Sequence, residues 1–397
     1  MCNQNPKRFM AKVTLLAQLL KHLPTDEIRQ KAHESGSNKH SKGIDTWTHL
    51  VSMVFCHLSN ATSLRDISNG LRSITGNLFH LGCTKAPSKS ALSYINQHRD
   101  HRVFEEIFHL TLRHLTRHIK FDRRKLHELK EKVYLLDATV IPLCSTVFDW
   151  AKFRTHKGAV KLHMVLDYDG GLPSYAVITD GSVHELTVAK DLSFPPGSVV
   201  VFDRGYLDFK WMGVLDSSAV AFVTRAKNNT AYEVVYANDV TPGTGVLKDE
   251  MVRLTGSKNA KDYAKLMRRV EFIEPVKGEV LEFLTNQTSW TAELVAQVYE
   301  QRWNIENFFK HIKTHLRIKS FVGTSENAVK IQIWTALITI LLLKAMKAIA
   351  RHKWHLSNLV TFLRMNLFVK INLYEYLDNP FPKKSIPSAE VQLGLFT

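Results

Sequence analysis

The period of the apolar positions changes near residue 132. Before it, apolar residues recur every three or four positions, as in helices with one buried face. Such stretches cover 13–20, 50–55, 64–71 and 89–98. Ser63 and the pair Pro87-Ser88 stand where the caps of the last two helices are expected. Residues 31–44 lack the helical period and predict a loop.

From residue 133 onward the period shortens to that of strands rich in valine. Strands are expected at 133–141, 161–168, 173–179, 198–202 and 219–224. A helical stretch at 207–215 separates the last two. The pattern predicts a mixed α/β domain behind a helical region.

Neither apolar runs nor cysteines indicate a membrane or secreted protein. The longest apolar run, 333–343, falls well short of the roughly 20 residues that span a bilayer, so it predicts a buried helix. The run at 13–20 has no small-residue cleavage site after it. The four cysteines form no C-x-x-C pair, which argues against a zinc ribbon or a disulfide framework. We expect a cytoplasmic protein with no membrane partner.

The 397-residue chain has a formal net charge of +16, which favours nucleic acid over an acidic membrane as partner. Residues 1–132 contain 22 Lys and Arg against 11 Asp and Glu, about +11 of the total. The cations Lys85, Lys89, Arg99 and Arg102 surround the helix at 89–98, as in a helix-turn-helix reader of the major groove. An ordinary basic helical bundle has the same features, so both readings stay open.

Two aspartates interrupt the apolar strands. Asp137 lies inside VYLLDATVI, and Asp203 ends SVVVFD two residues before Gly205. A carboxylate in a buried strand is costly unless it is compensated, usually by a metal ion. For either aspartate alone, a turn cap at the end of a strand is the simpler explanation.

A third acidic residue lies on a helix predicted from Thr291 to Leu316, with Ser289 as its cap. At 100° per residue, four residues share one narrow stripe beside the apolar face. They are Tyr299, Arg302, Glu306 and Lys313.

This stripe allows two interpretations. In the first, Glu306 joins the two aspartates around a metal, and Arg302 and Lys313 attract a phosphate. In the second, the helix is a surface helix on which Glu306 pairs with Arg302 or Lys310.

The spacing of the stripe, Y-x2-R-x3-E-x6-K, is that of the Y-R-E-K signature of bacterial transposases of the insertion sequence four family. With Asp137 and Asp203 upstream, residues 133–350 resemble the Asp-Asp-Glu catalytic domain of that family. The resemblance implies a ribonuclease H-like core.

The resemblance also implies a division of the chain. A β-rich insertion at about 226–288 would contain strands at 232–236, 265–273 and 280–285. The expected parts are a helical DNA-binding region at 1–130, the catalytic domain at 131–350, a helical region at 351–379 and a flexible tail at 380–397.

Transposition breaks and joins phosphodiesters, for which two divalent metals about 4 Å apart activate one oxygen and stabilise the other. A carboxylate cage favours Mg²⁺ or Mn²⁺ over zinc. In this reading Asp137 bridges the ions, and Asp203 and Glu306 each complete one site. By resemblance, water frees a transposon 3′ end, a hairpin forms on the flanking strand, and the 3′ hydroxyl attacks target DNA in a homodimeric complex.

The resemblance assigns the DNA contacts as well. Tyr299, Arg302 and Lys313 would hold a phosphate near the transposon end. Arg204 and Arg225 are further candidates, for which a solvated surface is an equal alternative. An aromatic residue of the insertion would stack on a flipped base, and both Phe283 and Trp290 qualify.

Two other functions remain to be separated from transposition. One is a domesticated DNA-binding protein that no longer cuts, and the intact acidic triad counts against it. The other is a stand-alone metal-dependent nuclease, which would not need inverted repeats in the flanking DNA. For a transposase we expect location on the bacterial nucleoid.

The end of the chain contains a second short motif. Gln392, Leu393, Leu395 and Phe396 resemble the pentapeptide with which bacterial proteins bind the sliding clamp of the replicase. Alternatively, these residues pack back on the catalytic domain.

Overall fold

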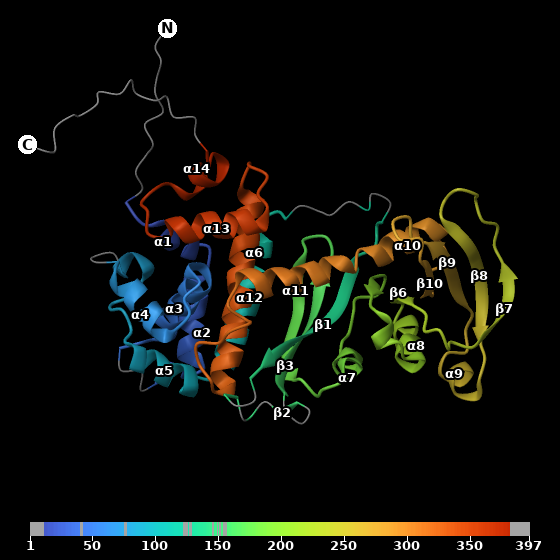
Figure 1. The fold of residues 1–397 in the computed structure, drawn as a ribbon, viewed down its shortest axis with the longest axis horizontal. Coiled ribbons are helices and arrows are strands. Elements are labelled where there is room, and N and C mark those ends of the chain that lie inside the picture. Colours follow the sequence, from blue (N-terminus) through green and yellow to red (C-terminus); the bar gives the residue numbers. More distant parts are fainter. Residues whose placement is uncertain are drawn as a thin grey trace, which may run out of the picture.

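The computed structural model describes residues 12–39, 43–74, 78–121, 126, 129–144, 147–148, 150, 152–153 and 157–381. The protein is elongated (Figure 1). The amino-terminal helices lie at one end, the central sheet lies in the middle, and the insertion forms the other end.

The amino-terminal region is helical, as predicted. It contains α1 (Leu15–Leu20), α2 (Thr25–Glu34), α3 (Thr46–Ser59), α4 (Leu64–Arg72), the short 3₁₀ helix η1 (Leu78–Leu81), α5 (Lys89–His98) and α6 (Arg102–His118). The predicted caps are confirmed, because Ser63 accepts from the Asp66 N–H and Ser88 from the Ala91 N–H. The loop predicted at 31–44 is wrong at its start, since α2 continues to Glu34. This helix buries only Ile28 and Ala32, so its apolar period is weak.

The central sheet is mixed and confirms the α/β prediction. Its first strands are β1 (Val133–Leu143), β2 (Lys152–Phe153), β3 (Lys157–Asp167), β4 (Leu172–Asp180), β5 (Val199–Val201) and β6 (Ala221–Arg225). β3 runs antiparallel to both β1 and β4, whereas β1, β5 and β6 are parallel neighbours. Three short helices follow β4 and β5, namely α7 (Glu185–Lys190), η2 (Arg204–Tyr206) and α8 (Phe209–Ser217).

The insertion extends this sheet. It contains β7 (Tyr232–Ala237), β8 (Val246–Leu254), α9 (Ser257–Asp262), β9 (Met267–Ile273) and β10 (Val280–Thr285). β10 pairs antiparallel with β6, and the order continues β10-β9-β8-β7. The apolar pattern did not predict β8, because the charged run Lys248-Asp249-Glu250 interrupts it.

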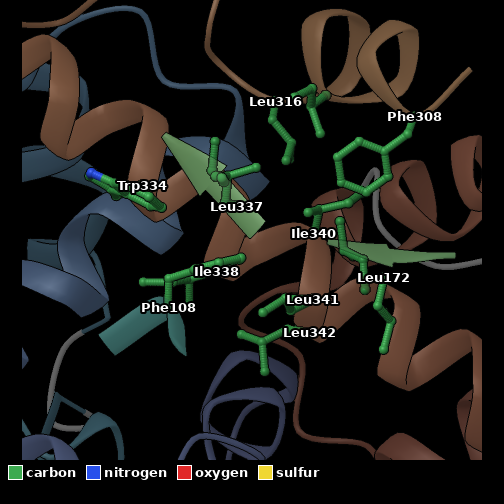
Figure 2. Packing of buried hydrophobic residues seen from close by; sticks show 14 of the residues in the cluster. Phe108, Leu172, Phe308, Leu316, Trp334, Leu337, Ile338, Ile340, Leu341 and Leu342 are labelled. Carbon is green, nitrogen blue, oxygen red and sulfur yellow. The ribbon is translucent and has the colours of Figure 1, made fainter. Parts of the chain in front are cut away.

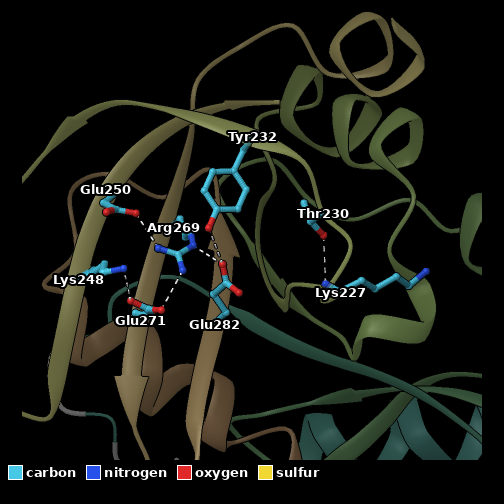
Figure 3. Close-up of polar contacts among 8 residues, drawn as sticks. All are labelled: Lys227, Thr230, Tyr232, Lys248, Glu250, Arg269, Glu271 and Glu282. Carbon is cyan, nitrogen blue, oxygen red and sulfur yellow. Dashed lines mark hydrogen bonds and ion pairs between the residues drawn. The ribbon is translucent and has the colours of Figure 1, made fainter. Parts of the chain in front are cut away.

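A cluster of charged side chains ties the strands of the insertion together (Figure 3). The side chain of Arg269 on β9 is 5% exposed and pairs with Glu250 at 2.6 Å, with Glu271 at 3.0 Å and with Glu282. Tyr232 of β7 donates its hydroxyl to Glu282 of β10 at 3.1 Å. Burial alone would lower the pKa of Arg269, but the hydrogen bonds and charges of Glu282 and Glu250 raise it. The cluster therefore joins β7, β8, β9 and β10.

The carboxyl-terminal helices are α10 (Ala292–Glu300), α11 (Trp303–His315), α12 (Glu326–Ile349), α13 (Leu356–Asn366) and α14 (Leu373–Asp378). The single helix predicted at 291–316 is thus interrupted at Gln301 and Arg302, whose N–H groups bond carbonyls only three residues earlier. The predicted cap is also wrong. Thr291, not Ser289, accepts from the Leu294 N–H.

Helix α12 forms the centre of the core (Figure 2). Within the described residues it is the one helix long and apolar enough to cross a membrane, but 89% of its most apolar window is buried inside the protein. Trp334 packs against Phe108 of α6, with ring centroids 5.5 Å apart. Leu337 and Ile340 face α11. The run 333–343 is therefore a buried core helix, as predicted.

The amino-terminal helices share this core with the sheet. His57 of α3 lies 3.0 Å from the Thr335 hydroxyl of α12, and Arg364 of α13 donates to the Leu58 carbonyl. The boundary expected near residue 130 marks a change of secondary structure, but it does not divide the core.

Candidate active site

Asp137 and Asp203 occupy matched positions on neighbouring strands. In the parallel pairing of β1 and β5, Leu135 is the partner of Val201, and each aspartate comes two residues later. Asp203 is itself extended, and side chains alternate along extended chain, so both aspartates face the same side of the sheet. Neighbouring strands lie about 4.8 Å apart. Strand pairing thus brings the two carboxylates together.

Glu306 approaches from α11, which crosses this face of the sheet over β1 (Figure 1). Arg302 Nη1 lies 2.5 Å from Glu306 Oε1 and 3.9 Å from Asp137 Oδ2. The ion pair expected in the second interpretation is therefore present, and the metal site of the first interpretation stays a prediction. Glu306 pairs with Arg302, and that pair lies beside Asp137.

The electrostatics of Asp137 reflect all three acids. Burial is the largest cause that raises the pKa of Asp137, and the negative charges of Asp203 and Glu306 add to a rise that reaches about 7. The Ala138 N–H, at 2.8 Å, and Arg302 oppose the rise. Asp137 therefore shares one electrostatic site with Asp203 and Glu306.

The cations of the stripe have different surroundings. Lys313 donates to the Thr139 hydroxyl at 2.5 Å and to the Val140 carbonyl at 2.9 Å, so it holds α11 on β1. Arg302 Nε is buried and has no hydrogen-bond partner within the described part of the chain. Burial keeps this donor away from solvent, so the guanidinium acts on the acidic site through its charge and through Nη1.

Tyr299 lies at the inner edge of the site and is 7% exposed. Its ring lies 4.9 Å from that of Phe283 and 5.7 Å from the guanidinium of Arg302. Burial raises the pKa of Tyr299 despite the nearby positive charges of Arg302 and Arg225. The structure therefore brings Arg225 of β6 towards the site, whereas Arg204 is exposed on the turn after Asp203.

The aromatic residues expected to stack on a base are both in the core. Phe283 is 1% exposed, because it lies on the inner face of β10 against Tyr299. Trp290 is 8% exposed and donates its indole N–H to Glu131 at 3.2 Å. Neither ring is available to a base in this structure, so the stacking prediction is corrected for both.

The helix-turn-helix interpretation also changes. Arg99 was expected to face DNA, but it is 7% exposed and donates to the carbonyls of Ser37, Ile44 and Asp45. It therefore holds the segment before α3 in place. Lys85 and Lys89 are exposed and remain candidates for DNA contact.

Tyr206 of η2 lies at the site although no pattern in the sequence indicated it. Its hydroxyl is buried without a hydrogen-bond partner among the described residues. Burial, followed by the charges of Asp137, Glu185 and Asp203, raises its pKa. The hydroxyl thus lies among the acidic residues. A tyrosine three residues after the second aspartate is the only signal in the sequence, and it does not distinguish a core residue from a site residue.

A family model described as a transposase DDE domain matches residues 128–342, more than half of the chain. The chain belongs to this family. A second model, a domain of unknown function (DUF4372), matches residues 11–84. The protein is therefore a DNA transposase, a DNA-cleaving enzyme whose family depends on divalent metal ions.

Curated relatives carry the same name. A Sinorhizobium fredii protein named as transposase y4zB is 32% identical over 65% of this chain and 71% of its own length. A transposase named for insertion sequence element IS5377 of Geobacillus stearothermophilus is 27% identical over 53% of this transposase and 55% of its own length. A transposase named for insertion sequence element IS4SA of Synechocystis is 26% identical over 64% of this chain and 70% of its own length.

The acidic residues of the transposase fit a divalent cation by their chemistry. In the ranges that the structure describes, no three Asp, Glu, His or Cys side chains are close enough to hold one ion. Asp137, Asp203 and Glu306 nevertheless offer only oxygen donors, which Mg²⁺ and Mn²⁺ prefer. The raised pKa of Asp137 indicates that Arg302 compensates this carboxylate incompletely.

We expect Asp137→Asn to stabilise the metal-free transposase above neutral pH. The folded pKa of about 7 exceeds the roughly 3.9 of an unfolded aspartate, so the folded state holds the proton more tightly. Wild type therefore loses stability as pH rises from about 4 to 7, whereas the variant has no such carboxyl. Thermal unfolding in EDTA should show the variant more stable at pH 8, by at most about 4 kcal/mol. The difference in stability between variant and wild type should be larger at pH 8 than at pH 5. An equal difference at the two pH values would contradict the expectation.

Proposed function

We propose that the chain is a transposase of the insertion sequence four type, which cuts at the ends of its element and joins them to target DNA. Asp137, Asp203 and Glu306 are the proposed catalytic residues. The observation that carries the proposal is the matched position of Asp137 and Asp203 on parallel strands, with Glu306 on the helix above them.

The strand order supports a ribonuclease H-like core. The order β4-β3-β1-β5-β6 has an antiparallel meander on one side of β1 and two parallel strands on the other. The insertion follows β6 and precedes α10, between the second aspartate and Glu306. The β-rich insertion of the Y-R-E-K transposases has the same position in the chain.

Asp137, Asp203 and Glu306 would hold two Mg²⁺ or Mn²⁺ ions. When bound, the ions would activate the attacking oxygen and stabilise the leaving oxygen of the phosphodiester. The positive charge of Arg302, which lies beside Asp137 and Glu306, would attract a phosphate oxygen. Lys313 would position α11 through Thr139 and Val140, and its charge would favour the same phosphate.

The test is cleavage by the full chain of DNA that contains the ends of its own element, in the presence of Mg²⁺. We expect breaks confined to the element ends that leave 3′ hydroxyls, and joining of those ends to a second DNA. Cuts without regard to the ends would support a stand-alone nuclease. Specific binding without cuts would support a DNA-binding protein that has lost catalysis.

Joining requires both ends of one element, so we propose that the enzyme acts as a homodimer on DNA, with hairpins on the flanking strands as in the resembling family. Both features rest on that resemblance. A gel analysis of the cleaved flanking strands would detect the hairpins, and light scattering of the complex would give the subunit count. We propose that the enzyme acts on the nucleoid, which contains its DNA.

The clamp motif formed by Gln392, Leu393, Leu395 and Phe396 lies outside the described residues. We propose that it binds the sliding clamp weakly, on the order of micromolar, because few residues are buried. Purified clamp should be recovered by wild type but not by a Leu395→Ala, Phe396→Ala double variant. Equal recovery by both proteins would overturn this part, and it would leave the catalytic assignment intact.

A further inference from the structure

A second cationic site lies on the far flank of α11. A cavity of about 390 Å³ opens between α11 and the end of α12. Its polar lining comes from Asn304, Asn307 and His311 of α11 and from Lys344 and Lys347 of α12. Among the described residues that line it, none is acidic. This described lining favours a negatively charged ligand.

The charges around His311 support this reading. Burial lowers the pKa of His311, and the positive charges of His315, Lys344 and Lys347 lower it further. Lys344 Nζ lies 5.4 Å from the centroid of the Phe308 ring, which keeps the ammonium group beside the cavity. Lys347 is exposed. An anion in the cavity would thus meet the ammonium groups of Lys344 and Lys347.

The position of the cavity relates it to the acidic triad. At 100° per residue, Asn304 and His311 lie about 140–160° around α11 from Glu306. The exposed ridge between these two flanks consists of Trp303, Asn307, Lys310 and Thr314. It contains no acidic residue, and Trp303 is 56% exposed. A polyanion can therefore cross the ridge from the triad to the cavity without meeting negative charge.

We propose that this cavity binds a backbone phosphate of the DNA strand that crosses α11 from the active site. The proposal rests on the proposed catalytic site, which defines where the strand begins. His311 is five residues from Glu306, about 7.5 Å along the helix axis, and the helix is about 10 Å across. At about 3.4 Å per nucleotide, a few nucleotides cover this span.

The test compares DNA binding by the full chain and by a Lys344→Gln, Lys347→Gln double variant over a range of salt concentrations. Both end-containing and random duplexes should bind about fivefold or more weakly, and the slope of log K against log salt should fall by about 1–2. The single Lys347→Gln variant should show part of this change, and it alters only an exposed side chain. Double replacement by arginine should restore binding.

Lys330→Gln is the matched control. Lys330 lies on the same helix but does not line the cavity, and it pairs with Glu326 at 2.5 Å. We expect no change of slope. If the double variant binds DNA with the wild-type affinity and slope, the proposal is overturned.

Two further measurements distinguish a site for free phosphate and a failure of the proposed triad from the proposed DNA site. Inorganic phosphate alone, titrated in a thermal-shift assay, tests for a site for free phosphate. Stabilisation by phosphate together with unchanged DNA binding by the double variant would overturn the DNA assignment. Cleavage by Glu306→Gln at the wild-type rate would instead refute the proposed triad, and the binding measurements on the cavity would stand.

Discussion

Glu306→Gln should reduce strand cleavage on the order of 10³-fold or more and change DNA affinity by no more than about twofold. Glutamine has nearly the size of glutamate, so α11 should stay in place, but it lacks the negative charge that a divalent cation requires. Asp203→Asn should behave in the same way. Single-turnover cleavage of labelled end DNA, with binding measured separately, gives both quantities.

Glu300→Gln is the matched control, because Glu300 is an exposed residue near the end of α10. Its cleavage rate should equal that of wild type. If Glu306→Gln cuts as fast as this control, the assignment of the triad is wrong. A parallel loss of binding and cleavage would indicate a damaged fold instead.

Arg269→Met should destabilise the protein by roughly 3–5 kcal/mol. The substitution leaves Glu250, Glu271 and Glu282 close together without the buried cation that compensates them. Methionine retains part of the packing, so the effect is mainly electrostatic. Urea unfolding at neutral pH should show the loss, and low pH should reduce it because the carboxylates become protonated.

The control within the insertion is Arg253→Met. Arg253 pairs with Glu233 at 2.9 Å, but both side chains are more than half exposed, so the stability should change by less than about 1 kcal/mol. A similar loss in the two variants would show that the cluster around Arg269 contributes no more than a surface pair.

The effect of Arg269→Met should extend to catalysis, because the insertion supports the start of α10. Arg268, the neighbour of Arg269, pairs with Asp249 at 2.7 Å and donates to the Trp290 carbonyl at 2.6 Å. Trp290 comes just before α10, which carries Tyr299. A loosened insertion should therefore lower the cleavage rate even below the unfolding temperature.

Local patterns in the sequence predicted most of the helices and strands and the residue types of the site. Ser63 and Ser88 cap helices at the predicted positions, since a cap needs only its own next turn. The strand around Asp137 and the buried helix at 333–343 were predicted from apolar patterns that are local to each segment. The spacing of the Y-R-E-K residues depends only on the helical repeat, and the short break at Gln301 and Arg302 still lets Arg302 reach Glu306.

How these parts meet depends on contacts between distant segments. The register of β1 on β5 sets the two aspartates side by side, and the pairing of β10 with β6 makes the insertion part of the central sheet. Both pairings join segments about 60 residues apart, for which no local period exists. The burial of Phe283 and Trp290, and the carbonyl contacts of Arg99, likewise depend on distant partners. Local backbone and capping preferences act within a few residues, whereas sheet register and side-chain burial are set by packing between segments remote in the chain.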